Sequence, residues 1–238
     1  LITVLIDADH PDYYKMTKEE REAYDKALKD NKDYEVFEEA PFWANGLGIT
    51  SRKRMALFLF DPASGRLERI SESELNVTDT VVLGDTLYFL GHTGPLVCLE
   101  KGATLYKVDY QKPEWQAQKI ADIDLYTREM LALGDHLVLL GTEGVRYGIN
   151  ENDWVYEIDP DNGELTLIRR EEYNMYGSVG SDCRMGGGHQ RMAMGDQLYY
   201  IGTREGDAHV FSMNLQGEVT PVITKTGSVD EIAVSENA

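Results

Sequence analysis

Three short apolar runs in the sequence each follow a Gly-Asp pair. The segments read LGDTLYFLG at 83–91, LGDHLVLLG at 133–141 and MGDQLYYIG at 194–202, so they are separated by 50 and 61 residues. Gly-Asp is typical of a turn, and a short run that is apolar at nearly every position is typical of a strand buried on both faces. The pattern predicts three equivalent buried strands.

A second phrase recurs with nearly the same spacing. Residues 56–67 read ALFLFDPASGRL and residues 154–165 read WVYEIDPDNGEL, with related segments at 104–109 and 209–219. A strand, an Asp-Pro-x-x-Gly turn and a second strand are typical of a hairpin. One period therefore contains an inner strand, the strand after Gly-Asp and an outer hairpin, which together are the unit of a β-propeller blade.

Counting these units predicts an all-β chain that is a single β-propeller fragment over residues 1–238. We expect a partial blade at 1–71 with a helical insertion at 7–39, whole blades at 76–120, 121–169 and 173–224, and a lone inner strand at 228–234. Either the chain is an arc of a larger propeller, or the last strand completes the first blade and closes a four-bladed ring. We favour the arc, because four is the low end of known blade numbers.

The insertion has its own sequence signals. Thr17 and Glu20 have the spacing of a capping box, which predicts a helix from there to about Leu28. Residues 1–40 hold 12 acidic and 6 basic residues. A solvent-exposed helix that projects from the rim of the propeller accounts for this charge without any function. The alternative is that the insertion is a lid or a docking surface.

Composition narrows the possible partners. With 23 basic and 42 acidic residues the net charge is −19, which argues against nucleic acid and anionic membranes as partners. No apolar run approaches the roughly 18 residues of a membrane span.

The start of the sequence and its cysteines bear on the compartment. The chain starts inside an apolar strand and without a signal peptide, so we expect that its start is a cut within a longer protein and that the protein is cytoplasmic. Cys98 and Cys183 are 85 positions apart, and we expect two free thiols in a reducing compartment.

The sequence lacks the usual catalytic and metal-binding spacings. There is no G-x-S-x-G elbow, and the five histidines show neither HxxxH nor HExxH pairing. The loop that starts at Asp159 is similar to a calcium loop, but Gly163 is misplaced for one, so we interpret it as a hairpin turn. The three glycines at 186–188 are not part of a phosphate-binding motif, because neither a Lys-Ser/Thr pair nor the G-x-G-x-x-G pattern accompanies them. We therefore expect no catalytic residue, no metal and no cofactor on this chain.

One glycine-rich stretch does not fit the repeat. Residues 177–190 read GSVGSDCRMGGGHQ and occupy the inner-strand position of the last whole blade. Inner strands line the axial channel of a propeller, so Asp182 and Arg184 are candidate channel-facing, substrate-binding residues. The alternative is a structural bend in which these two side chains pair only with each other.

Two longer motifs resemble a known family. They are PFWANGLGITSRKRMALFLFD at 41–61, and GSDCRMGGG at 180–188 followed by GDQLYYIGTREGDAHVF at 195–211. Their order and spacing are similar to the propeller of prolyl oligopeptidase family serine peptidases, in the bacterial acylaminoacyl peptidase and dipeptidyl-peptidase-like branch. The WVYE sequence at 154–157 is superficially similar to an acidic amine-binding motif of dipeptidyl peptidases. Its place in the repeat, on an outer strand, favours blade structure instead.

The resemblance implies a non-catalytic role. In such enzymes the propeller restricts entry to peptides and holds the N-terminal side of the substrate, and an α/β-hydrolase domain C-terminal to it carries the catalytic Ser, Asp and His. The expected partners are a peptide substrate and that hydrolase domain, and uncovered blade faces predict self-association. One alternative is a stand-alone propeller that binds a peptide or protein. Another is an axial-site enzyme such as a metal-assisted lactonase or a glycosidase, against which the missing ligand clusters argue.

Overall fold

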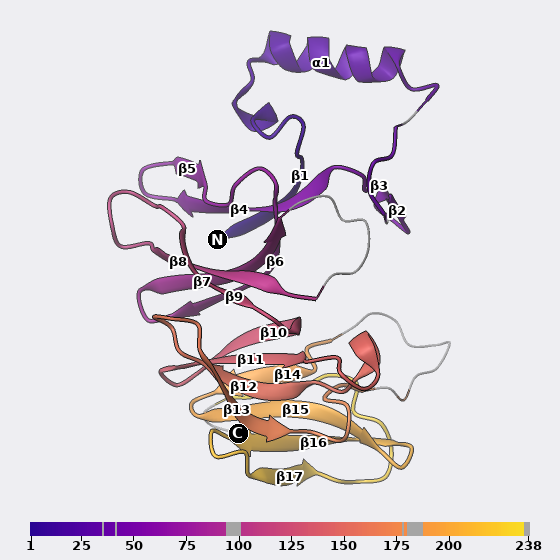
Figure 1. Cartoon of the computed structure of the whole chain (residues 1–238), viewed down its shortest axis with the longest axis vertical. Helices are drawn as coiled ribbons and strands as arrows, with labels where there is room; N and C mark the ends of the chain where they lie inside the picture. Colours follow the sequence, from indigo (N-terminus) through magenta and orange to yellow (C-terminus); the bar gives the residue numbers. More distant parts are fainter. Residues whose placement is uncertain (35, 41, 94–100, 178, 180–187, 236–238) are drawn as a thin grey trace. The chain divides into compact units, whose positions relative to one another are not determined.

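The protein is described from a computed structural model that covers residues 1–34, 36–40, 42–93, 101–177, 179 and 188–235. Its described residues form small antiparallel sheets and one α-helix (Figure 1). The first sheet has the order β1-β4-β5, and a two-residue pair, β2-β3, precedes β4 in the chain. The bounds are β1 (Ile2–Asp7), β2 (Trp43–Ala44), β3 (Gly48–Ile49), β4 (Lys53–Asp61) and β5 (Arg66–Arg69).

Three further sheets have four strands each, ordered as in the sequence: β6-β7-β8-β9, β10-β11-β12-β13 and β14-β15-β16-β17. This is the predicted four-stranded blade unit, and the chain has the predicted all-β propeller class with one helical insertion. The bounds are β6 (Leu75–Leu83), β7 (Thr86–Thr93), β8 (Ala103–Asp109), β9 (Gln118–Ile123), β10 (Tyr126–Leu133), β11 (His136–Thr142), β12 (Trp154–Ile158), β13 (Leu165–Arg170), β14 (Arg191–Met194), β15 (Gln197–Arg204), β16 (Asp207–Asn214) and β17 (Val219–Ile223).

The Gly-Asp pairs form the turns between the first and second strands of these sheets. Gly84, Gly134 and Gly195 have φ angles of 57°, 54° and 55°, a left-handed conformation that glycine adopts without a steric penalty. The second strands β7, β11 and β15 then run through the interior, and Val138, Leu139 and Leu140 are all 0% exposed. This burial explains why the strands are apolar on both faces.

The predicted hairpin turn at Asp159 is also present. The Gly163 N–H donates to the Asp159 carbonyl at 2.8 Å, and Gly163 has a φ of 75°. The Asp159 carboxylate accepts from the backbone N–H of Asp161 at 2.8 Å and from the Asn162 side chain at 3.1 Å. The carboxylate is thus used to build the turn, as in an Asx-turn.

By its internal contacts the chain divides into two compact units. The first comprises Leu1–Thr78, Leu90–Glu100 and Lys112–Ala117, and the second comprises Asp79–Phe89, Lys101–Gln111 and Gln118–Ala238. Within the second unit, one hydrophobic cluster is contributed by the β10–β13 and β14–β17 sheets together. Its buried members are Leu133, Val138, Leu140, Val155, Met175, Leu198, Tyr200, Phe211 and Met213.

One described segment of the second unit differs from the expected strand. Residues 228–234, expected as a lone inner strand, form no regular strand. They contact β16 through a parallel bridge between Ala208 and Ser228, and Ile232 N–H donates to the carbonyl of His189 at 2.9 Å. The first strand of the last sheet is β14, which begins at Arg191, directly after the glycine-rich stretch.

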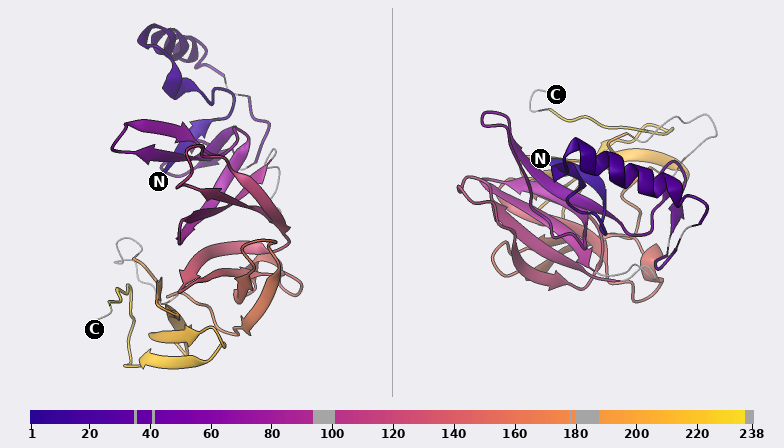
Figure 2. Two further views of the ribbon diagram at one scale, coloured as in Figure 1. Left: turned by 90° about the vertical axis from the view of Figure 1, so that its left-hand side faces the viewer. Right: turned by 90° about the horizontal axis from the view of Figure 1, so that it is seen from above.

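The insertion in the first unit contains the expected helix, α1 (Lys18–Asp30), after a short 3₁₀ turn at Tyr13–Lys15. Both hydrogen bonds of the Thr17–Glu20 capping box are present, and the helix runs two residues beyond the predicted end. None of its residues is buried, and Figure 1 and the left view of Figure 2 show it standing off the β1-β4-β5 sheet. Among the described residues, we find no helix that combines the length and apolarity needed to cross a membrane.

Candidate functional site

The two residues predicted from the sequence to bind substrate, Asp182 and Arg184, lie outside the described residues, as do Cys98 and Cys183. The structure does describe both flanks of the glycine-rich stretch. The Gly177 N–H donates to the Gln190 side-chain oxygen at 2.9 Å. The two ends of the glycine-rich stretch are therefore held together directly before β14, and we call this contact between Gly177 and Gln190 the stem.

Polar residues recur at one position of the first strands, next to this stem. Asp79 on β6, Glu129 on β10 and Gln190 before β14 each lie five residues before the glycine of the following Gly-Asp turn. Since the sheets repeat the same local structure, these residues are equivalent positions of three repeats, two on first strands and one directly before β14. Together with Arg128, Arg191 and Asp153 they belong to what we call the first-strand cluster, all of it in the second unit.

Ion pairs connect the members of this cluster. Arg191 pairs through Nε with Glu129 of the neighbouring sheet, and its Nη1 lies 4.0 Å from Asp153 Oδ2. Arg128 Nε donates to Asp153 Oδ1 at 3.3 Å. Asp79 is bound differently, because its carboxylate accepts the backbone N–H groups of Thr80, at 2.7 Å, and of Met130. The cluster thus links successive first strands through side chains.

Burial changes the acidity of two of its carboxyl groups. It raises the pKa of Asp79 to about 6, with a smaller contribution from Glu129, while the two backbone N–H donors and Arg191 act in the opposite direction. Burial also raises the pKa of Asp153, although Arg128 and Arg191 oppose it. Carboxyl groups with raised pKa values are enriched at functional sites and also occur in structural ion-pair networks. The arrangement offers charged hydrogen-bonding groups, without a nucleophile paired to a base.

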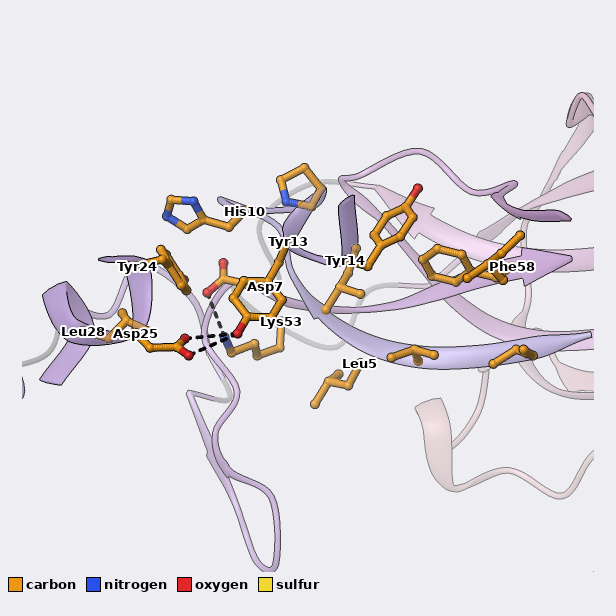
Figure 3. A pocket seen from close by; sticks show the side chains of 15 residues that line it. Leu5, Asp7, His10, Tyr13, Tyr14, Tyr24, Asp25, Leu28, Lys53 and Phe58 are labelled. Atoms are coloured by element: carbon orange, nitrogen blue, oxygen red, sulfur yellow. Dashed lines mark hydrogen bonds and ion pairs between the residues drawn. The ribbon is translucent and has the colours of Figure 1, made fainter. Parts of the chain in front are cut away.

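A second feature is a hollow of about 380 Å³ in the first unit, between β1 and the insertion (Figure 3). We call it the β1 hollow. It is mostly apolar, with polar groups of Asp7, Lys53, Tyr13 and Asp25 at its edge. The lining residues are Ile2, Val4, Leu5, Ile6, Asp7, His10, Pro11, Tyr13, Tyr14, Tyr24, Asp25, Leu28, Lys53, Phe58 and Leu67.

The polar groups of the β1 hollow are paired. Lys53 Nζ lies 2.8 Å from Asp7 Oδ2, and the Tyr13 hydroxyl donates to Asp25 Oδ1 at 3.1 Å (Figure 3). The ring of Tyr24 lies 5.5 Å from that of Tyr13. These contacts hold the helix over the hollow without burying it.

Two arginines clamp the insertion to the sheet. Arg54 on β4 is 0% exposed, and its guanidinium donates to both oxygens of Glu39, at 3.0 and 2.5 Å. Arg52, with a φ of 58°, donates through Nε to Asp9 at 3.0 Å and through its two terminal nitrogens to Glu74 at 2.9 and 2.7 Å. Both ends of the insertion are thus held by basic residues of the 41–61 motif. The hydrogen bonds from Arg54 lower the pKa of Glu39 despite its burial.

The WVYE sequence lies on β12, in the hairpin formed by the third and fourth strands of its sheet. Glu157 pairs with His136 on β11 at 2.6 Å, and the Trp154 ring lies under the guanidinium of Arg170 at 4.4 Å. These are contacts within one sheet, as expected for blade structure. In the part of the chain that is described, no three His, Cys, Asp or Glu side chains are grouped so that they could hold a metal ion.

The comparison with solved structures identifies the fold. No family model matches the chain, and no curated protein matches its sequence. Among solved structures, an acylaminoacyl peptidase from Pyrococcus horikoshii matches 87% of this chain at 15% identity, with a TM-score of 0.61. An acylaminoacyl peptidase in complex with Z-Gly-Gly-Phe-chloromethyl ketone matches 85% at 14% identity and a TM-score of 0.59. A puromycin hydrolase matches 77% at 13% identity and a TM-score of 0.52.

The chain spans only about 30% of the length of these structures, namely 30% of the two acylaminoacyl peptidases and 28% of the puromycin hydrolase. The described residues of this chain form three four-stranded sheets, each ordered as in the sequence. The chain therefore has the fold of the β-propeller portion of acylaminoacyl peptidase structures.

Proposed function

We propose that this chain is the non-catalytic propeller portion of a serine peptidase of the prolyl oligopeptidase family, in its acylaminoacyl peptidase branch. In this role it restricts access to peptides and positions them for a C-terminal α/β-hydrolase domain. The observation that carries the proposal is the fold shared over 87% of the chain with an acylaminoacyl peptidase. The ordered sequence motifs at 41–61 and 180–211 support it independently.

Two features of the second unit support a role in positioning the substrate. The stem formed by Gly177 and Gln190 anchors the stretch that carries Asp182 and Arg184. Next to it, the first-strand cluster holds carboxylates and guanidinium groups on successive sheets, of which Asp153 is buried and the others are partly or fully exposed. Charged groups of this kind bind the polar backbone and terminal amine of a peptide. We infer that the candidate residues contact substrate, that the protein acts in the bacterial cytosol, and that the fragment alone performs no catalysis.

The first experiment separates this proposal from a stand-alone binding propeller. The gene should encode a G-x-S-x-G elbow within the next few hundred residues downstream, at the scale of a hydrolase domain. The full-length product should hydrolyse acylaminoacyl or dipeptidyl chromogenic substrates, and purified residues 1–238 should not. A gene without such a downstream domain would support the stand-alone propeller. Hydrolysis by residues 1–238 that is blocked by a fluorophosphonate would refute the non-catalytic role.

The second experiment tests the site residues in the full-length enzyme. We expect Asp182→Asn and Arg184→Gln to raise the KM for peptide substrates while kcat with a minimal chromogenic ester stays unchanged. The matched control is Asp161→Asn, which removes an exposed partner of Lys107 on a hairpin turn. Equal effects of all three substitutions on KM would show that Asp182 and Arg184 have no specific role.

A further inference from the structure

Two buried nitrogen atoms of the last sheet lack hydrogen-bond partners. They are Nε of Arg204 on β15 and Nε2 of His209 on β16, and neither is paired within the described part of the chain. Asp207 Oδ2 lies 3.9 Å from His209 Nε2, beyond hydrogen-bond distance. The His209 side chain is 16% exposed and Arg204 is only partly buried, so both residues reach the surface. Buried polar groups are nearly always paired, so these two call for a partner.

The two residues share one face of the sheet. In the register of β15 and β16, Arg204 is opposite Asp207 and Gly202 is opposite His209, and residues directly opposite each other point to the same side. Phe211, two residues after His209, also lies on this face and belongs to the hydrophobic cluster shared with the β10–β13 sheet. The unpaired nitrogens therefore lie on the side of the last sheet that packs against its neighbour within the second unit.

Aromatic rings, rather than a carboxylate, hold the guanidinium of Arg204. Its Cζ lies 4.1 Å from the ring centroid of Phe211 and 4.5 Å from that of Tyr173. Such contacts stabilise the positive charge but give the N–H groups no oxygen acceptor. Arg191 on the same sheet pairs with Glu129, whereas no carboxylate among the described residues forms an ion pair with Arg204. Its charge is thus left for another group to neutralise.

The segment that carries Tyr173 is fixed to β15. The side-chain oxygen of Asn174 accepts the N–H of Thr203 at 3.1 Å, and the Thr203 hydroxyl donates to the carbonyl of Tyr176 at 3.2 Å. A Cβ on Gly202 would lie only 3.3 Å from the Asn174 carbonyl oxygen, so the segment packs closely on the strand. The ring and the guanidinium are therefore held in place, which lowers the entropy cost of binding a ligand. Because Tyr176 directly precedes the stem, this place adjoins the glycine-rich stretch.

A carboxylate is the ligand group that fits these donors. A guanidinium binds a carboxylate through two parallel N–H bonds, and His209 donates from Nε2 in the tautomer that carries its proton there. Asp207 does not supply this group to Arg204, because its Oδ1 accepts the N–H of Gly227 at 2.9 Å. A phosphate with two negative charges is repelled more strongly by Asp207 and by a chain of net charge −19 than a singly charged carboxylate is.

We propose that Arg204 and His209 form a binding site for a carboxylate group, beside the rings of Tyr173 and Phe211. The carboxylate belongs either to a peptide ligand or to the remainder of a longer protein that contains this chain. The proposal does not depend on the proposed peptidase role, because it needs only the unpaired donors on β15 and β16.

NMR titration of residues 1–238 tests the site, with ¹H–¹⁵N spectra of the arginine Nε–H groups and the histidine rings. The probes are sodium acetate and N-acetyl-dialanine, compared with the C-terminal amide of the same peptide and with sodium chloride at equal ionic strength. We expect the Arg204 signal to shift saturably with acetate and with the free acid. The amide and chloride should not shift it.

Substitutions then assign the donors. Read from the His209 ring, Arg204→Gln should lower the affinity for acetate at least ~10-fold, because charged hydrogen bonds are lost. Arg204→Lys keeps the charge without the planar fork, so its affinity should lie between the two. Read from Arg204, His209→Leu should lower the affinity about 3–10-fold, as expected for one neutral hydrogen bond.

The matched control is Arg146→Gln, because Arg146 also stacks on a tyrosine, with its Cζ 4.9 Å from the Tyr147 ring centroid. It should leave the affinity for acetate unchanged. Circular dichroism checks the fold of each variant, and Arg204→Lys, which keeps a cation beside the rings, serves as the test in case Arg204→Gln unfolds.

The same titration of the full-length protein distinguishes the two sources of the carboxylate. An Arg204 signal that is already shifted and does not respond to acetate would assign the group to the protein itself, and a response like that of residues 1–238 would assign it to a ligand. Three results would overturn the proposal: no saturable shift of Arg204 in residues 1–238, an equal shift with the amide or chloride, or an unchanged affinity in the Arg204 variants.

Discussion

The buried pair of Arg54 and Glu39 gives the sharpest test of how the insertion is held. Their side chains are 1% and 3% exposed. Glu39→Gln keeps the shape of the side chain but leaves the buried guanidinium with only the more distant carboxylate of Glu74, whose Oε2 lies 3.8 Å from Nη2. Loss of one partner of such a pair costs about 3–5 kcal/mol. Arg54 also donates to the carbonyls of Lys53 and Glu74 at 3.0 and 3.3 Å, and these bonds remain, so we expect the lower end, about 3 kcal/mol.

The measurement is urea unfolding at a fixed protein concentration, followed by tryptophan fluorescence after Trp115→Phe and Trp154→Phe, so that Trp43 in the same unit is the reporter. The double variant Glu39→Leu/Arg54→Met removes both charges together, so we expect it to recover most of the loss. Glu68→Gln is the control, because its pair with Arg66 is partly exposed and worth less than about 1 kcal/mol. A loss below about 1 kcal/mol for Glu39→Gln, or a double variant worse than either single variant, would refute this reasoning.

Three other expectations follow from described contacts. The raised pKa of Asp79 means that its neutral form is favoured in the folded state, so its contribution to stability is complete below about pH 4 and is lost as the pH rises through 6. At 1.36 kcal/mol per pKa unit the loss is at most about 3 kcal/mol, and pH-dependent urea unfolding should flatten in Asp79→Asn. Gly141→Ala would place a Cβ 2.8 Å from the carbonyl oxygen of Tyr126, so thermal unfolding should show a loss of about 1–3 kcal/mol. Thr17→Ala removes the capping box with Glu20; we expect α1 to lose about 1 kcal/mol, seen as faster amide exchange in its first turn only.

Much of the fold could be predicted from local patterns. The Gly-Asp pairs and the Asp-Pro-x-x-Gly turns determine backbone conformation within a few residues, and Thr17 with Glu20 determines where the helix begins. The clamp at Arg54 could not be predicted in this way. It joins residues 15 positions apart, and an arginine within an alternating strand pattern is normally exposed.

The first-strand cluster was missed for a different reason. The repeat is defined by its apolar positions, whereas the polar residues Asp79, Glu129 and Gln190 stand five positions before each glycine, outside that apolar pattern. Aligning the repeats on their glycines uses the sequence alone and brings these residues together. The glycine-rich stretch offered no such signal beyond its composition, and Asp182 and Arg184 stay a prediction.

The hydrophobic cluster shared by the β10–β13 and β14–β17 sheets bears on how the second unit folds. Leu140 and Tyr200, from different sheets, are buried in the same cluster, so neither sheet has a complete core of its own. Stability in such an arrangement is approximately a sum of the strength of each repeat and the strength of its interface with its neighbour. The second unit should therefore gain its stability cooperatively, when adjacent repeats meet. A nascent chain that ends at Arg170 would expose an apolar surface until the following sheet is synthesised.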